Sequence, residues 1–430
     1  MTEVVDSYPL SPLQHGMLFH HLQGGRETGV DVEQLDAKLH EPIDAATLTR
    51  AWAAVADRHA ILRTRFRWEG LDAPRQEVVA SVSAPVEWRD ISHLSSGDQA
   101  ATLASFLRDD RRRGFDLGEA PLWRVTTFRL ADDEYRMVWT YSHAILDSCY
   151  AEVLREVFAA YEALRQNGRP HFDERPAYRD HISWLQGDLH ARARQIQAFW
   201  RERLAGFTTP TNLEAVQIPA SDRAAAEHQT AHDVVRFKLS AETSDTIRRS
   251  AVEFDLRVSV FVEAAWALVL GAFTGEEDVV FGTTRACRRS SIPRADAILG
   301  LFINTLPTRA AIPPDKPLIA LLRELRADQI ALRSFEHTPL VDVVASAGIA
   351  RGAPLFETIV VFNDMDNDAR FKSFGGAWAA RDFELLDQTN FPLNVMAYDG
   401  PEISFKLSYE RRRFARDTVE RIASLLAALL

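Results

Sequence analysis

The sequence predicts a mixed α and β protein built as two large halves. Its 430 residues are about three times the ~150 residues of an ordinary domain. In both halves, segments with a helical period alternate with segments with a strand period. A stretch rich in Gly, Pro and charge at residues 167–176 separates the halves. Hydrophobic residues make up 46% and charged residues 26% of the chain, which excludes a disordered or fibrous protein.

Helix and strand patterns alternate through the first half. Residues 44–59 have the pattern of an amphipathic helix with Asp44 as its N-cap, and residues 62–69 have the alternation of a half-buried strand. The apolar stripe of this helix consists of Leu48, Trp52 and Val55. Residues 123–130 and 134–141 are strand-like runs around a polar turn, which predicts a hairpin. From Tyr150 the period is helical again, up to Asn167 and Gly168.

The second half repeats the mixture. An apolar helix is predicted at residues 261–273 and an amphipathic helix at the C-terminus. Strands or apolar runs are predicted at 277–284, 298–307, 357–363 and 403–410.

Charge and composition exclude several classes of function. Fifty Lys and Arg against 61 Asp and Glu give a net charge of −11, which argues against a nucleic-acid partner. Two cysteines, Cys149 and Cys287, cannot form a disulfide framework or a thiolate zinc site. No metal-binding or phosphate-binding motif is present, and the N-terminus lacks a signal peptide. No apolar run is long enough for a membrane span. We therefore expect a cytoplasmic protein without a metal.

The junction between the strand at 134–141 and the helix from Tyr150 carries the candidate chemistry. A histidine at a strand end, His143, is held rigidly and can take a proton from a nucleophile. Asp147 could orient the imidazole or anchor the loop. The alternative is a packed histidine beside a helix-capping aspartate. Ser142 is a poor nucleophile for His143, because adjacent residues of an extended chain point to opposite sides, and Cys149 fits a small buried filler.

The sequence resembles the condensation domains of non-ribosomal peptide synthetases over nearly its whole length. YPLSPLQHGMLFH is similar to the first motif of that family, RHAILRTRF to the second, and YSHAILDS to the central HHxxxDG motif. The later motifs follow in the order of the family: YRDHISWL, AFWRERLAGFTTPTNL, GEEDVVFGTT, LGLFINTLPTR, HTPLVDV and APLFETIVVFN.

The resemblance implies two chloramphenicol-acetyltransferase-like lobes, arranged as a V around a central tunnel. We place the N-terminal lobe at residues 1–172 and the C-terminal lobe at 173–430. The implied reaction joins a donor acyl thioester to the amine of an aminoacyl acceptor. Substrates arrive on the phosphopantetheine of carrier proteins or on coenzyme A, and the domain itself holds no cofactor. Neighbouring synthetase domains are the implied further partners.

The family's motifs assign roles to individual residues. His143 matches the second histidine of the central motif, which positions or deprotonates the amine. Asp147 matches the motif aspartate, and Arg288 matches the arginine that pairs with it, so both are expected to support the loop. The resemblance further suggests substrate-tunnel positions that could equally be structural: Tyr150, Asn304, His337 and Asn363. Arg58 and Arg63 of the second motif are expected to be structural.

The departures from the motif keep a second class of function open. Ser142 replaces the first histidine, and Ser148 replaces a glycine, which removes permissive backbone geometry and adds bulk. A catalytically impaired platform that recruits a carrier protein or tailoring enzyme is therefore the alternative to an acyltransferase. A third reading is a stand-alone acyltransferase that acts on a soluble amine or alcohol.

The subtype is open as well. The first motif begins within a few residues of Met1, which fits a starter domain or a downstream synthetase protein. Glu27 and Thr28 replace the Gly-Asp of the dual epimerization type, so dual activity is not expected.

Overall fold

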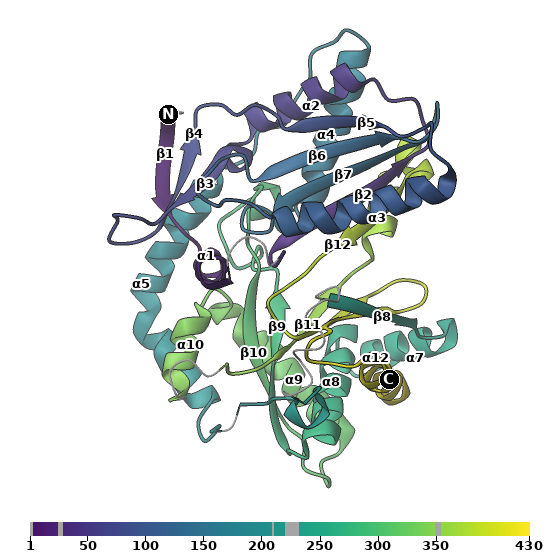
Figure 1. Cartoon of the computed structure of the whole chain (residues 1–430). Coiled ribbons are helices and arrows are strands. Elements are labelled where there is room, and N and C mark those ends of the chain that lie inside the picture. The colour runs from purple at the N-terminus through teal and green to yellow at the C-terminus, as the bar shows by residue number, and fades with distance from the viewer. Residues whose placement is uncertain (1–2, 25–28, 209, 220–231, 349–353) are drawn as a thin grey trace. The chain divides into compact units, whose positions relative to one another are not determined.

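The chain divides into two compact units (Figure 1). The computed structural model describes residues 3–24, 29–208, 210–219, 232–348 and 354–430, so Glu27 and Thr28 lie outside the described residues. Unit 1 consists of Met1–Gly187, Ser291–Phe302 and Asn367–Asn390, and unit 2 of Asp188–Ser290, Ile303–Asp366 and Phe391–Leu430. The first change of unit follows Gly187, whereas the expected lobe boundary after residue 172 stays a prediction. Two later segments then return to unit 1. Asn367–Asn390 joins it through strand pairing, and Ser291–Phe302 joins it through hydrogen bonds between its backbone and side chains of unit 1.

A five-stranded sheet forms the centre of unit 1, in the order β12-β2-β7-β6-β5. Its strands are β2 (Val32–Leu39), β5 (Val86–Asp90), β6 (Trp123–Arg129), β7 (Tyr135–Ser142) and β12 (Asp382–Leu386). β6 and β7 pair antiparallel around a short turn, which confirms the predicted hairpin. β12 is one of the returning segments, and it pairs antiparallel with β2.

The helices of unit 1 include the two whose apolar stripes the sequence predicts, at residues 44–59 and from Tyr150 onward. They are α1 (Pro12–Gly24), α2 (Ala45–Arg58), α3 (Ser96–Arg113), α4 (Tyr150–Arg165), the start of α5 (Tyr178–Arg203), and α11 (Asn367–Lys372). The stripe of α2 is fully buried, and the Asp44 carboxylate accepts a hydrogen bond from Thr47 N at 2.7 Å, which confirms the cap. The Trp52 ring lies 5.2 Å from Trp123 and 5.0 Å from Trp139, centroid to centroid. This aromatic cluster joins α2 to β6 and β7.

The strand predicted at residues 62–69 is shorter than expected. Residues Ala60–Arg63 form a 3-10 turn, and the strand β3 runs only over Thr64–Arg67. The reason is the Arg63 side chain, whose Nε donates to Ala56 O at 3.1 Å and whose Nη1 donates to Ala80 O. β3 belongs to a three-stranded sheet of order β1-β4-β3 with β1 (Val4–Pro9) and β4 (Arg75–Val79).

A buried carboxylate, Asp110, ties α3 to the five-stranded sheet. Its two oxygens accept hydrogen bonds from Arg124 Nε at 2.5 Å, Thr140 Oγ1 at 2.6 Å and Gln34 Nε2 at 3.1 Å. These partners lie on three neighbouring strands, β6, β7 and β2. A buried charge with this many partners fixes the position of the helix end.

Unit 2 is built around a six-stranded sheet in the order β10-β9-β11-β13-β14-β8. Its strands are β8 (His232–Lys238), β9 (Asp278–Arg285), β10 (Asn304–Ala311), β11 (Thr358–Asn363), β13 (Leu393–Tyr398) and β14 (Ser404–Glu410). Its helices are α7 (Ala241–Glu253), α8 (Val258–Thr274), α9 (Leu318–Leu332), α10 (Leu340–Ala347) and α12 (Arg416–Leu429). The predicted helices and strands of the second half are confirmed. One correction is that the apolar run at 298–307 becomes a strand only from Asn304.

The connecting segments include four further short 3-10 turns: Glu214–Val216, Ala295–Ala297, Arg333–Phe335 and Gly376–Ala380. Among the described residues, no individual helix has both the length and the apolar character needed to cross a bilayer. Only α7 and α8 taken together, with a bend of 108° between them, meet that criterion.

Candidate active site

His143 lies immediately beyond the paired ends of β2 and β7. Val32 pairs with Ser142 in the register of the two strands, and His143 N continues the ladder by donating to Asp31 O at 2.8 Å. On the other side of β7, Ser142 N donates to Leu122 O at 2.9 Å. Backbone hydrogen bonds on both sides therefore fix the start of the loop, as expected for a residue at a strand end.

The imidazole of His143 has a defined proton arrangement. Its Nδ1 lies 2.7 Å from the carbonyl oxygen of Leu146. A carbonyl oxygen can only accept a hydrogen bond, so Nδ1 carries the hydrogen and Nε2 of the neutral ring keeps its lone pair. The side chain is half-buried. This is the tautomer that a base acting through Nε2 requires.

Charges around His143 favour its protonated form. Burial alone would lower the pKa of His143, but the Glu33 carboxylate and the Leu146 carbonyl, together with Asp31 and Asp147, more than offset this effect, so the pKa is raised. The pKa of Asp31 is itself raised to about 6, because burial disfavours its charge more than His143 favours it.

Asp147 holds the loop through backbone groups. It is 2% exposed, and its two carboxylate oxygens accept hydrogen bonds from Cys149 N at 3.0 Å and Phe302 N at 2.8 Å. The first bond closes the turn into α4, and the second ties the loop to the returning segment Ser291–Phe302. This geometry fits the supporting role that we expected for Asp147, whereas the pairing with Arg288 stays a prediction.

The returning segment Ser291–Phe302 packs closely against the loop of His143. Cys149 Sγ lies 3.4 Å from both the N and the O of Gly300. Tyr178 Oη donates to Leu301 O at 2.6 Å, and the buried His181 ring stacks on Phe302 with 4.0 Å between centroids. Cys149 therefore packs against backbone, as predicted for a buried filler.

The residues that depart from the family motif have ordinary local roles. Ser142 Oγ accepts a hydrogen bond from Ala144 N at 3.3 Å, so it stabilises the turn of the loop. Ser148 is exposed and its φ is not positive, so the backbone does not need a glycine there. Tyr150 begins α4, is buried, and hydrogen-bonds Asn367 Oδ1 through its hydroxyl.

The other predicted positions lie in unit 2. Asn304 donates to Glu336 O at 2.9 Å and Thr338 O at 2.8 Å, so its amide holds the backbone on either side of His337. His337 Nε2 lies 3.0 Å from Ser290 Oγ, and burial lowers the pKa of His337. These contacts favour the structural alternative for Asn304.

Arg288 and Asn363 are the remaining positions in unit 2. Arg288 follows Cys287, whose φ of 57° lies in the left-handed region. Asn363 is the last residue of β11, and its carbonyl accepts a hydrogen bond from Asp399 N at 2.8 Å. Tunnel contact by any of the predicted positions stays a prediction.

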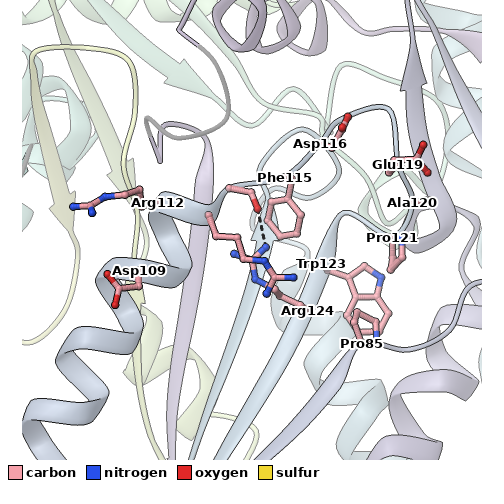
Figure 2. Close-up of a pocket in the computed structure, with 12 residues that line it drawn as sticks. Pro85, Asp109, Arg112, Phe115, Asp116, Glu119, Ala120, Pro121, Trp123 and Arg124 are labelled. Carbon is pink, nitrogen blue, oxygen red and sulfur yellow. Dashed lines mark hydrogen bonds between the residues drawn. The ribbon is translucent and has the colours of Figure 1, made fainter.

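A pocket of about 660 Å³ lies elsewhere in unit 1, at the end of α3 (Figure 2). Arg112, Arg113 and Phe115 line it, and the Arg124 guanidinium lies 4.4 Å from the centre of the Phe115 ring. None of residues 141–150 lines this pocket. In the described part of the chain, no three His, Cys, Asp or Glu side chains group as a metal site.

The fold and the His143 loop define a known class of protein. The chain matches the condensation-domain family over residues 4–430, so it belongs to that family. Condensation domains are amide-bond-forming acyltransferases, and this chain is a condensation domain of the non-ribosomal peptide synthetase type.

Individual relatives agree with this assignment. The chain is 37% identical to one protein of the linear gramicidin synthase of Brevibacillus parabrevis over 425 residues, which cover 98% of this chain and only 5% of that much longer protein. Among solved structures, the starter condensation domain of rhizomide synthetase in complex with C8-CoA has a TM-score of 0.79 at 20% identity, over 98% of this chain and 94% of that one. The X-domain from teicoplanin biosynthesis, in complex with OxyB, has a TM-score of 0.80 at 20% identity, over 98% and 92%. The mixed α/β fold is therefore that of condensation domains.

One charged residue near His143 lies outside every motif of the sequence. Glu33 of β2 is 4% exposed and lies opposite Tyr141 in the register of β2 and β7. No motif includes Glu33, and residues 32–39 are not among the predicted strands. The register between two strands that are about 100 residues apart would have been needed to find it.

Proposed function

We propose that this chain joins a donor acyl thioester to the amine of a carrier-bound aminoacyl acceptor, with His143 as the residue that positions or deprotonates the amine. The single observation that carries the proposal is the hydrogen bond from Nδ1 of His143 to Leu146 O, at 2.7 Å. It leaves the lone pair of Nε2 for the amine. The donor is carried by coenzyme A or by the phosphopantetheine of a carrier protein.

In the proposed reaction His143 is the only group that accepts and returns a proton. The amine nitrogen attacks the thioester carbonyl, a C–N bond forms, and the amine proton passes to Nε2. The C–S bond then breaks, and the proton leaves with the thiol. An imidazolium exists between these two steps, and the surrounding carboxylates favour that charged state. We further propose that the domain acts in the cytoplasm, where Cys149 and Cys287 remain thiols.

The test is reconstitution with a panel of acyl-CoA and acyl-carrier donors and an aminoacyl carrier protein, with mass spectrometry of the acceptor. We expect amide product with the wild-type chain and loss of that product with His143→Ala, without a change in melting temperature. Retained turnover by His143→Ala would rule out the assigned role. The matched control is His190→Ala, which removes a histidine of α5 outside the site and should leave turnover intact.

The second candidate function is a platform that binds a carrier protein or a tailoring enzyme without forming product. The replacements at Ser142 and Ser148 support it, as does the similarity of the fold to an X-domain solved in complex with OxyB. Binding of the acceptor carrier without amide product would favour this function. Product formed with a soluble amine, in the absence of an acceptor carrier, would instead favour a stand-alone acyltransferase.

A further inference from the structure

Glu33 shares a face of the sheet with the catalytic candidate. Residues that pair across two antiparallel strands lie on the same face, as do residues two apart on one strand. Glu33 pairs with Tyr141, and His143 stands two residues after Tyr141. Glu33 and His143 are therefore diagonal neighbours, a separation that long side chains can bridge.

Glu33 is buried, so its charge affects the protonation of the groups around it. It is 4% exposed, and burying a carboxylate is costly unless opposite charges compensate it. The Arg111 guanidinium of α3, which donates to Val32 O of the same strand, interacts favourably with Glu33, and protonated His143 is the second such partner. Of the carboxylates that favour protonated His143, Glu33 acts most strongly, ahead of Asp31 and Asp147. Glu33 also contributes to the raised pKa of Tyr141, where burial is the main cause.

Asp147 is poorly suited to the same task. Both of its oxygens accept hydrogen bonds from backbone N–H groups of the loop and of the returning segment. These hydrogen bonds hold both oxygens of Asp147 against the loop and the returning segment. The motif aspartate thus shapes the loop, and Glu33 is the carboxylate that most strongly favours the protonated form of His143.

We propose that Glu33 is a positioning residue that stabilises the imidazolium of His143 from the neighbouring strand. The inference rests on the proposed function, in which Nε2 of His143 accepts the proton of the amine. In this proposal Glu33 contributes only its charge, and the proton moves only between the amine, Nε2 and the leaving thiol. The titratable or charged groups around this site come from β2 and its preceding turn, from α3, from β7, from the loop, from α4 and from the returning segment Asn367–Asn390: Asp31, Glu33, Arg111, Tyr141, Asp147, Cys149, Tyr150, Arg370 and Asp387.

The direct test is an NMR titration of His143 in the full chain with ¹³C-labelled histidine, assigned with His143→Ala. Glu33→Gln keeps the size and removes the charge, so we expect the pKa of His143 to fall. Glu33→Asp keeps the charge one methylene further back, so we expect a pKa between those of wild type and Glu33→Gln. The matched control, Glu384→Gln, removes an exposed carboxylate of β12 and should leave the titration unchanged.

An unchanged His143 titration in folded Glu33→Gln would overturn the inference, whatever its effect on melting temperature. If Glu33→Gln does not fold, the His143 titration is measured in Glu33→Asp instead. A pKa of His143 identical to that of wild type in this variant would refute the inference.

The pH profile of kcat/KM for amide formation separates this inference from the proposed function. We expect its acid limb to move to lower pH in Glu33→Gln together with the titration. A shifted titration with no amide product from wild type would support the pairing of Glu33 with His143 and refute the proposed function.

Discussion

Glu263→Gln is expected to stabilise unit 2 at neutral and alkaline pH. Glu263 lies in the apolar helix α8 and is 5% exposed. Its Oε1 accepts a hydrogen bond from Gln329 Nε2 at 2.9 Å, while Oε2 is buried and has no partner among the described residues. Burial raises its pKa from 4.5 to about 7, although Arg285 and Gln329 oppose this effect.

The magnitude follows from linkage between protonation and folding. The folded state binds the proton more tightly than the unfolded state, so the free energy of unfolding falls as pH rises from about 4.5 to about 7. At about 1.4 kcal/mol for each pKa unit, the loss above pH 7 is about 3 kcal/mol. Glutamine has the shape of the protonated acid and does not ionise. Glu263→Gln should therefore be more stable than wild type by up to about 3 kcal/mol at pH 8.

Urea unfolding at pH 5 and pH 8, followed by circular dichroism and tryptophan fluorescence, measures the effect. We expect the free energy of unfolding of Glu263→Gln to exceed that of wild type clearly at pH 8 and by much less at pH 5. Glu253→Gln, an exposed residue of α7, is the matched control and should stay within about 0.5 kcal/mol of wild type at both values. A variant at 263 that is no more stable than wild type at pH 8 would refute the reasoning.

Three further predictions concern packing and buried hydrogen bonds. Asp110→Ala leaves the buried Arg124 without its partner and should lower the free energy of unfolding by about 3–5 kcal/mol in urea titrations. Gly300→Ala should lower the melting temperature, because a Cβ would lie 2.2 Å from the Tyr178 ring at a φ of +156°, whereas Gly187→Ala, in open space in α5, should raise it slightly. Asp147→Ala removes the acceptor of two buried N–H groups, Cys149 N in the His143 loop and Phe302 N. The free energy of unfolding should fall by about 1–3 kcal/mol for each unpaired group, and amide formation should decrease.

Each of these has a contrary outcome. A cost below about 1 kcal/mol for Asp110→Ala would show that water replaces the carboxylate. Equal melting temperatures for the two glycine variants would contradict the close approach at Gly300, and full stability of Asp147→Ala would contradict its support of the loop.

Local patterns predicted the elements that a few neighbouring residues determine. The stripe of α2, its Asp44 cap and the hairpin of β6 and β7 follow from side-chain spacing, which acts within one helical turn or one strand pair. The strand at 62–69 was predicted too long because Arg63 bonds to carbonyls that are far away in the sequence. The period of a sequence pattern cannot predict hydrogen bonds to acceptors that are distant along the chain.

His143 and Asp147 could be found in the sequence because they lie four residues apart in one loop, and because the motifs around them match a family in order. The neighbours that act on them could not. Glu33 lies on a strand about 100 residues earlier, and Phe302, which binds Asp147, comes more than 150 residues later. Neither the contact of Glu33 nor that of Phe302 produces a pattern in the spacing of neighbouring residues.

The sequence by itself determined the mixed class of the fold, some of its helices and strands, and the candidate base, because these depend on short-range periodicity and on a contiguous motif. Only the tertiary structure decided which segments return to unit 1 and which carboxylate faces the imidazole. Strand register and backbone hydrogen bonds between remote segments set these contacts, and they are properties of the folded chain as a whole.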